Sequence, residues 1–214
     1  MNALRLRLRL LSVALLIVLV APTMSAAKAM RVALFVDTSA ATSSAIVQIR
    51  AAVAAFIDTL PPESEIVLVT TGRRAQVRVQ PTTDKAKLKS SASGMLSENG
   101  PTALMDALVD VDERFMRKAA DRWPVFVILT ADGNDSSKED EQEFNRWISE
   151  ITRRGVSVNA LVLKASTLGL TGSIATVLTR STHGHYTSMG MTSGIPEAMT
   201  QLAEQLSADA AQRP

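Results

Sequence analysis

Short unbroken apolar runs alternate along this chain with segments in which apolar residues recur every three or four positions. The unbroken runs are typical of strands buried on both faces of a parallel sheet, and the periodic segments are typical of helices with one buried face. The segment AQVRVQP instead alternates apolar and polar residues, as the edge strand of a hairpin does. The expected strands span residues 31–36, 65–71, 75–81, 123–130, 156–163 and 185–189, and the expected helices span 46–60, 84–97, 103–117, 141–154, 170–180 and 195–207.

This order of elements predicts an α/β fold. Strands that alternate with helices of this length favour a doubly wound, mostly parallel sheet with one antiparallel edge strand, in a Rossmann-like three-layer arrangement. The sequence shows no internal repeat and no second domain. We therefore expect one domain over residues 30–207, followed by a disordered tail at 208–214.

The first 27 residues have a different pattern. Arg5, Arg7 and Arg9 precede an apolar run from Leu10 to Val20, and small residues follow. This is the layout of a secretory signal peptide, and the run is short for a membrane span, which needs about 20 apolar residues. We expect a signal peptide at 1–27 or, as the alternative, an N-terminal anchor helix. Both export the domain to a periplasmic or extracellular location.

Charge and cysteine content narrow the classes of function. The three arginines of the leader belong to a total of 23 Lys and Arg against 21 Asp and Glu, so the remainder carries 20 against 21, a net charge of −1. No block rich in Lys and Arg remains, which argues against nucleic acid and anionic membranes as partners. The chain has no cysteine, so a disulfide framework, a thiolate zinc site and a cysteine nucleophile are excluded.

Three polar loops are expected at one edge of the sheet, because loops that follow the carboxyl ends of parallel strands lie together and form ligand sites. The first loop begins at Asp37 and contains Ser39, the second contains Thr102, and the third contains Asp132. Hard oxygen donors without His or Cys suit Mg²⁺, Mn²⁺ or Ca²⁺ rather than zinc. The alternative is structural: Ser43 or Ser44 caps a helix and Asp132 shapes a turn with Gly133.

These segments resemble a known family. FVDTSAATS, NGPTALMDAL and VILTADGND are similar to the three metal-site segments of von Willebrand factor type A domains, in the family's order and separations. The resemblance implies that Ser39 and Thr102 bind a cation directly and that Asp37 and Asp132 bind it directly or through water. It also implies that an acidic group of a protein partner completes the coordination shell, as in a metal-ion-dependent adhesion site.

The first loop departs from the family pattern Asp-x-Ser-x-Ser, because Ala41 stands where the second serine is expected. This substitution removes one oxygen ligand. A water molecule or Thr42 could replace it, or the domain has kept the fold without the metal.

We therefore expect an exported protein-binding domain that uses Mg²⁺ or Mn²⁺ at a degenerate adhesion site. The alternative is a metal-free scaffold in an envelope complex. An α/β hydrolase is a distant third, since no nucleophile can be paired with a base, and we expect no enzyme activity. His183 and His185 could begin a metal site on one face of a strand, but no third ligand is identifiable.

Overall fold

A computed structural model describes residues 28–164 and 169–213. The expected signal peptide at 1–27 lies outside the described residues. The strands are β1 (Met30–Val36), β2 (Glu65–Thr71), β3 (Ala75–Thr82), β4 (Trp123–Ala131), β5 (Ser157–Leu163) and β6 (Tyr186–Met189). The helices are α1 (Ile46–Thr59), α2 (Lys85–Ser93), α3 (Leu104–Val111), α4 (Glu141–Arg153), α5 (Leu170–Thr182) and α6 (Ile195–Ala211), with short helical turns η1 (Ala40–Ala45), η2 (Asp112–Met116) and η3 (Thr192–Gly194).

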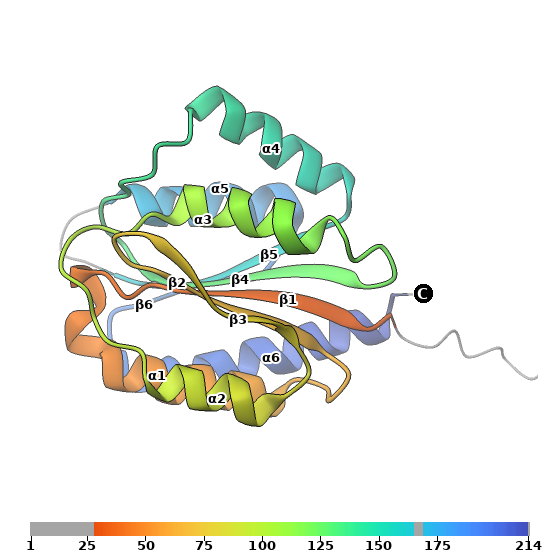
Figure 1. Ribbon diagram of the computed structural model, residues 1–214, viewed down its shortest axis with the longest axis horizontal. Helices are drawn as coiled ribbons and strands as arrows, with labels where there is room; N and C mark the ends of the chain where they lie inside the picture. Colours follow the sequence, from red (N-terminus) through yellow and green to blue (C-terminus); the bar gives the residue numbers. More distant parts are fainter. Residues whose placement is uncertain (1–27, 165–168, 214) are drawn as a thin grey trace, which may run out of the picture.

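The six strands form one sheet in the order β3-β2-β1-β4-β5-β6. All neighbouring strands are parallel except β2 and β3, which form an antiparallel hairpin at one edge. Figure 1 shows α1, α2 and α6 on one face of the sheet and α3, α4 and α5 on the other. The predicted doubly wound, mostly parallel sheet with one antiparallel edge strand is confirmed.

Each face of the sheet has its own apolar core, because side chains of a strand point alternately to opposite faces. Val32, Leu34 and Val36 of β1 pack with α1, α2 and α6. Ala33 and Phe35 pack with α3, α4 and α5 on the other face. This two-sided burial explains why the central strands are continuously apolar in sequence.

Helix α1 and the preceding turn η1 form a 20-residue segment, Ala40–Thr59, that is long and apolar enough to cross a membrane by length and composition. In the fold, Ile49, Val53, Phe56 and Ile57 of this segment are buried in the core. The segment therefore has the apolar face that a core helix needs.

The C-terminal helix is longer than expected. Helix α6 continues to Ala211, so the prediction of a disordered tail from residue 208 is wrong for residues 208–211. Ala210 is buried, and the guanidinium of Arg213 lies 4.0 Å from the centre of the Trp123 ring. These contacts with the start of β4 hold the end of the chain against the sheet.

Candidate functional site

A pocket of about 280 Å³ lies at the carboxyl edge of the sheet, between the ends of β1 and β4. The chain order reverses between these two strands, and this is where ligands bind in open α/β sheets. Small residues make up most of its wall. It is lined by Asp37, Ser39, Ala40, Ala41, Gly100, Pro101, Thr102, Ala131, Gly133 and Asn134.

Asp37 is the buried charged residue of this pocket, with an exposed fraction of 1%. Its Oδ1 accepts a hydrogen bond from the Ser39 amide at 2.7 Å. Its Oδ2 accepts one from Thr130 Oγ1 at 2.8 Å and one from the Ala131 amide at 3.2 Å. Burial raises the pKa of this carboxyl above its ordinary value, and the hydrogen bonds from Ser39, Thr130 and Ala131 oppose that effect. Asp37 therefore ties the first loop to the end of β4.

The threonine hydroxyls near Asp37 also have partners. Thr102 Oγ1 donates to the Thr71 backbone oxygen and lies 2.9 Å from Thr71 Oγ1. Thr42 Oγ1 lies 2.9 Å from the Asp37 backbone oxygen and 3.0 Å from that of Ser39. Thr42 is thus engaged with the backbone of its own loop and does not replace the serine missing at position 41.

Asp132 does not join the other predicted site residues. Its Oδ1 accepts hydrogen bonds from the amides of Gly169 and Gly172, each at 3.0 Å, at the N-terminus of α5. A Cβ atom on Gly172 would lie 2.6 Å from that oxygen, so the helix approaches the carboxylate closely. The structure therefore brings Asp37, Ser39 and Thr102 together, while Asp132 caps α5 from a neighbouring loop.

Other polar residues of the loops have structural contacts. Asp135 Oδ2 accepts from the Leu104 amide at 2.7 Å, which ties the third loop to the start of α3. Ser43 and Ser44 are exposed, and the helices that begin near them have no side-chain cap. The structural alternative of helix capping thus holds for acidic residues of the third loop and not for these serines.

The segment that forms this pocket is similar to a known family. Residues 32–134 match the model of the von Willebrand factor type A domain. Over this segment the chain is similar to the von Willebrand factor type A family. This match spans the pocket from β1 to Asn134, and the resemblance predicted from the three loop segments is confirmed. No curated protein matches the chain in sequence.

Solved structures of von Willebrand type A proteins share this fold at low sequence identity. A von Willebrand factor type A protein from Catenulispora acidiphila has a TM-score of 0.71 and 16% identity, over 84% of this chain and 43% of that one. An aerotolerance-related membrane protein from Bacteroides fragilis, with multiple mutations to serines, has a TM-score of 0.61 and 14% identity, over 82% and 99%. The present chain thus spans less than half the length of the first protein.

One solved structure of the same fold contains a metal ion. Proximal thread matrix protein 1 from the mussel byssus, solved with a zinc-occupied adhesion motif, has a TM-score of 0.60 and 17% identity, over 83% of this chain and 46% of that one. A cation site of this kind is therefore occupied in at least one protein of the same fold.

The pocket of the present domain does not fit a resident Mg²⁺ or Mn²⁺. Mg²⁺ requires near-ideal octahedral coordination by oxygen atoms. Ala41 and Ala131 line the pocket without an oxygen in their side chains, and the carboxylate of the third loop is bound to α5. The oxygens of Asp37 already accept three hydrogen bonds. Among the described residues, no three His, Asp or Glu side chains gather into a metal site.

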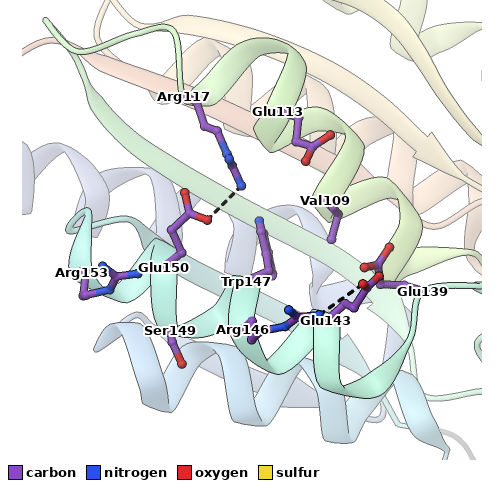
Figure 2. Close-up of a pocket in the computed structure, with 10 residues that line it drawn as sticks. All are labelled: Val109, Glu113, Arg117, Glu139, Glu143, Arg146, Trp147, Ser149, Glu150 and Arg153. Atoms are coloured by element: carbon purple, nitrogen blue, oxygen red, sulfur yellow. Dashed lines mark hydrogen bonds and ion pairs between the residues drawn. The ribbon is translucent and has the colours of Figure 1, made fainter.

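A larger groove of about 550 Å³ lies between α4 and the segment of α3 and η2, and Figure 2 shows its charged lining. Its arginines are largely paired: Arg117 lies 3.1 Å from Glu150, and Arg146 lies 3.2 Å from Glu143. Beneath it, the buried carboxylate of Asp112 accepts a hydrogen bond from Trp147 Nε1 at 3.0 Å. These contacts join α4 to η2 and account for the charged residues structurally.

The histidines do not form a metal site together. His183 adopts a left-handed conformation, with φ of 55°, at the end of α5. His185 Nε2 lies 2.9 Å from Asp209 Oδ2 of α6. His185 therefore links the start of β6 to the C-terminal helix.

Proposed function

We propose that this von Willebrand type A domain is exported and binds a partner protein through the loops around the Asp37 pocket, without a resident cation. The observation that carries the proposal is the pocket itself. It lies at the reversal point of the sheet, and its one buried charged group is fully hydrogen-bonded within the domain. Such a pocket offers a preformed surface for a ligand.

The chemistry of the lining favours a side chain of a protein as the ligand. Ala40 and Ala41 are exposed at the rim, and Gly100, Pro101 and Gly133 add small apolar surfaces. A wall of small residues accepts an apolar or neutral side chain, whereas a carboxylate would meet Asp37 with no cation between them. Export is supported by the charged and apolar pattern of residues 1–27 and by the membrane protein from Bacteroides fragilis with the same fold.

The second candidate is binding that depends on Mg²⁺ or Mn²⁺. The convergence of Asp37, Ser39 and Thr102 on one pocket favours it. The alanines at positions 41 and 131 weigh against it, and for this reason we propose the metal-free function first. We also propose that the domain has no enzyme activity of its own, in keeping with the hydrogen-bonded state of Asp37.

Capture of partners from an envelope extract, with and without EDTA, tests these alternatives. Ala41→Arg fills the pocket entrance, and Ala120→Arg makes the same change at an exposed position. We expect a partner that the wild type and Ala120→Arg retain in EDTA and that Ala41→Arg loses. Loss of the partner in EDTA, with heat of Mg²⁺ binding in titration calorimetry, would establish the cation-dependent function instead. Equal capture by both variants would refute the pocket as the binding site.

A further inference from the structure

Strand β3 forms an edge of the sheet and pairs with β2 alone. Ala75 and Val77 pack on the core, while Gln76, Arg78 and Gln80 are exposed. An edge strand presents backbone amide and carbonyl groups that have no partner strand, and an extended peptide can pair with them. β3 thus offers eight residues for the addition of another strand.

Three arginines gather on this hairpin. Arg73 and Arg74 occupy the turn between β2 and β3, Arg78 lies on β3, and all three side chains are exposed. Within the described part of the chain, none of the three forms an ion pair. Six arginines elsewhere have carboxylate partners within 4.0 Å, namely Arg31, Arg114, Arg117, Arg122, Arg146 and Arg154, whereas the other unpaired arginines of the described residues, Arg50, Arg153, Arg180 and Arg213, do not lie on this hairpin.

This positive cluster is a local property of the hairpin. From residue 28 onward the chain has 20 Lys and Arg (the total of 23 less Arg5, Arg7 and Arg9) against 21 Asp and Glu, so the domain has no general basicity. Unpaired arginines that stand together on a nearly neutral protein favour a ligand with negative charge.

A groove of about 340 Å³ adjoins the hairpin and is lined by Arg73, Arg74, Gln76 and Glu98. Glu98 belongs to the wall, because its carboxylate accepts hydrogen bonds from Thr38 Oγ1 at 3.4 Å and from the Arg73 amide at 3.3 Å. The groove therefore has polar walls and two arginines whose guanidinium groups are available to a ligand.

The combination of an open strand edge and unpaired arginines identifies the chemistry of the partner. Two copies of β3 would bring arginines together and repel each other, so the cluster discourages pairing of the strand with itself. Arg74 lies in the turn just before β3, and Arg78 lies at a β-bulge between Val77 and Val79, which pair with the adjacent residues Val69 and Leu68. Both arginines are exposed, so an added strand that carries several carboxylates would bring them close to these two guanidinium groups.

We propose that β3 binds an extended acidic segment of a partner protein, which joins the sheet as an additional strand with its carboxylates paired to Arg74 and Arg78. This proposal rests on the protein-binding function above, but it concerns a second surface next to the Asp37 pocket. A Cβ atom on Gly100, which lines that pocket, would lie 3.3 Å from Arg73 Cγ, so the two surfaces are contiguous.

The test uses labelled peptides of about eight residues, the length of β3, with the full chain in solution. One peptide alternates Glu and Thr, and a neutral one alternates Gln and Thr. Fluorescence anisotropy should show saturable binding of the acidic peptide alone, weakened by salt at about 1 M, where the Debye length falls to about 3 Å. Arg74→Glu with Arg78→Glu should reduce the affinity at least tenfold. Arg153→Glu with Arg180→Glu, an equal change of charge at two exposed arginines, should leave the affinity within about twofold.

Backbone hydrogen exchange separates strand addition from ion pairing alone. In the complex, amides of β3 should exchange more slowly, whereas those of β6 at the opposite edge should not change. The proposal is overturned by absence of saturable binding, by an equal loss in the Arg153 and Arg180 variant, or by unchanged exchange in β3. Binding to anionic phosphatidylglycerol vesicles that needs Arg74 and Arg78, without peptide binding, would also overturn it. Ala41→Arg should bind the peptide normally, so failure of the Asp37 pocket and failure of β3 are distinguishable.

Discussion

Replacing Asp132 by alanine tests whether this carboxylate is a helix cap or a site residue. Asp132 is nearly buried, with an exposed fraction of 9%, and its Oδ1 accepts hydrogen bonds from the amides of Gly169 and Gly172. The first amides of a helix have no partner within the helix, so the carboxylate supplies a partner that the local sequence lacks. Gly169, at the N-cap position of α5, has no side chain that could do so.

The size of the expected effect follows from these contacts. Loss of an N-terminal cap costs about 0.5–2 kcal/mol. The Gly172 amide is buried, and an unsatisfied buried donor costs about 1–3 kcal/mol. Because the two contributions overlap, we expect Asp132→Ala to lower the free energy of unfolding by about 2–3 kcal/mol. For a domain of this size that corresponds to about 5–10 °C in Tm.

Thermal and urea unfolding in EDTA measure the effect on the domain without metal. Asp132→Asn keeps an oxygen acceptor, and asparagine is as good an N-cap as aspartate, so it should retain most of the stability. Asp121→Ala, at a side chain that is 80% exposed, should change Tm by less than about 2 °C. If Asp132→Ala unfolds at the wild-type temperature, the carboxylate does not cap α5, and our assignment of its role is wrong.

Three further results are expected. Ala41→Ser with Ala131→Asp places oxygen ligands on the pocket wall. Titration calorimetry should therefore detect Mg²⁺ or Mn²⁺ binding in the double variant and not in the wild type. Equal heats in both proteins would contradict the conclusion that the wild-type pocket does not fit these cations. Gly184→Ala should destabilise the domain by more than about 2 kcal/mol in urea unfolding, since a Cβ atom there would collide with the backbone oxygen of Val158. Burial, followed by repulsion from nearby carboxylates, raises the pKa of Glu139 above its ordinary 4.5. Because the pKa of Glu139 is raised in the folded state, the stability that this carboxyl contributes is present below its ordinary pKa and is lost as pH rises through the raised value. Glu139→Gln should therefore gain stability relative to wild type between about pH 4 and pH 7. A stability difference that does not depend on pH would refute this prediction.

The sequence predicted the fold well because its signals are local. The apolar run that ends at Val36 and the alternation in residues 75–77 each report which faces of a strand are buried. The position of β3 at the edge follows from that alternation, since a central strand would be apolar on both faces.

The role of Asp132 could not be predicted in the same way. Ala131 and Asp132 are adjacent at the end of β4, and consecutive side chains point in different directions. Which of them faces the pocket depends on the register with β5, where Ala131 pairs with Leu163, and on the approach of α5. Both are contacts between segments far apart in sequence, so the motif alone could not show that the Asp132 carboxylate accepts hydrogen bonds from the first amides of α5.

Asp112 is a second example of a residue whose environment depends on distant segments. In sequence it belongs to an ordinary charged run, yet it is fully buried and its Oδ2 lies 2.6 Å from Arg154 and 3.0 Å from Trp147 Nε1. These partners come from α4 and the residue after it, and no local pattern indicates that they meet a carboxylate of η2.

The two ends of the described chain meet at the edge of the sheet opposite the pocket. The Lys28 amide lies 3.5 Å from the Arg213 backbone oxygen, and Figure 1 shows the C-terminus at the end of the sheet far from the start of α1. Lys28 and Arg213 therefore lie on the side of the domain away from Asp37 and from the β2–β3 hairpin that carries Arg73, Arg74 and Arg78. Fixed to a support through either end, the domain would hold both proposed binding surfaces outward, so a sensor chip or a fusion partner attached there should not obstruct them.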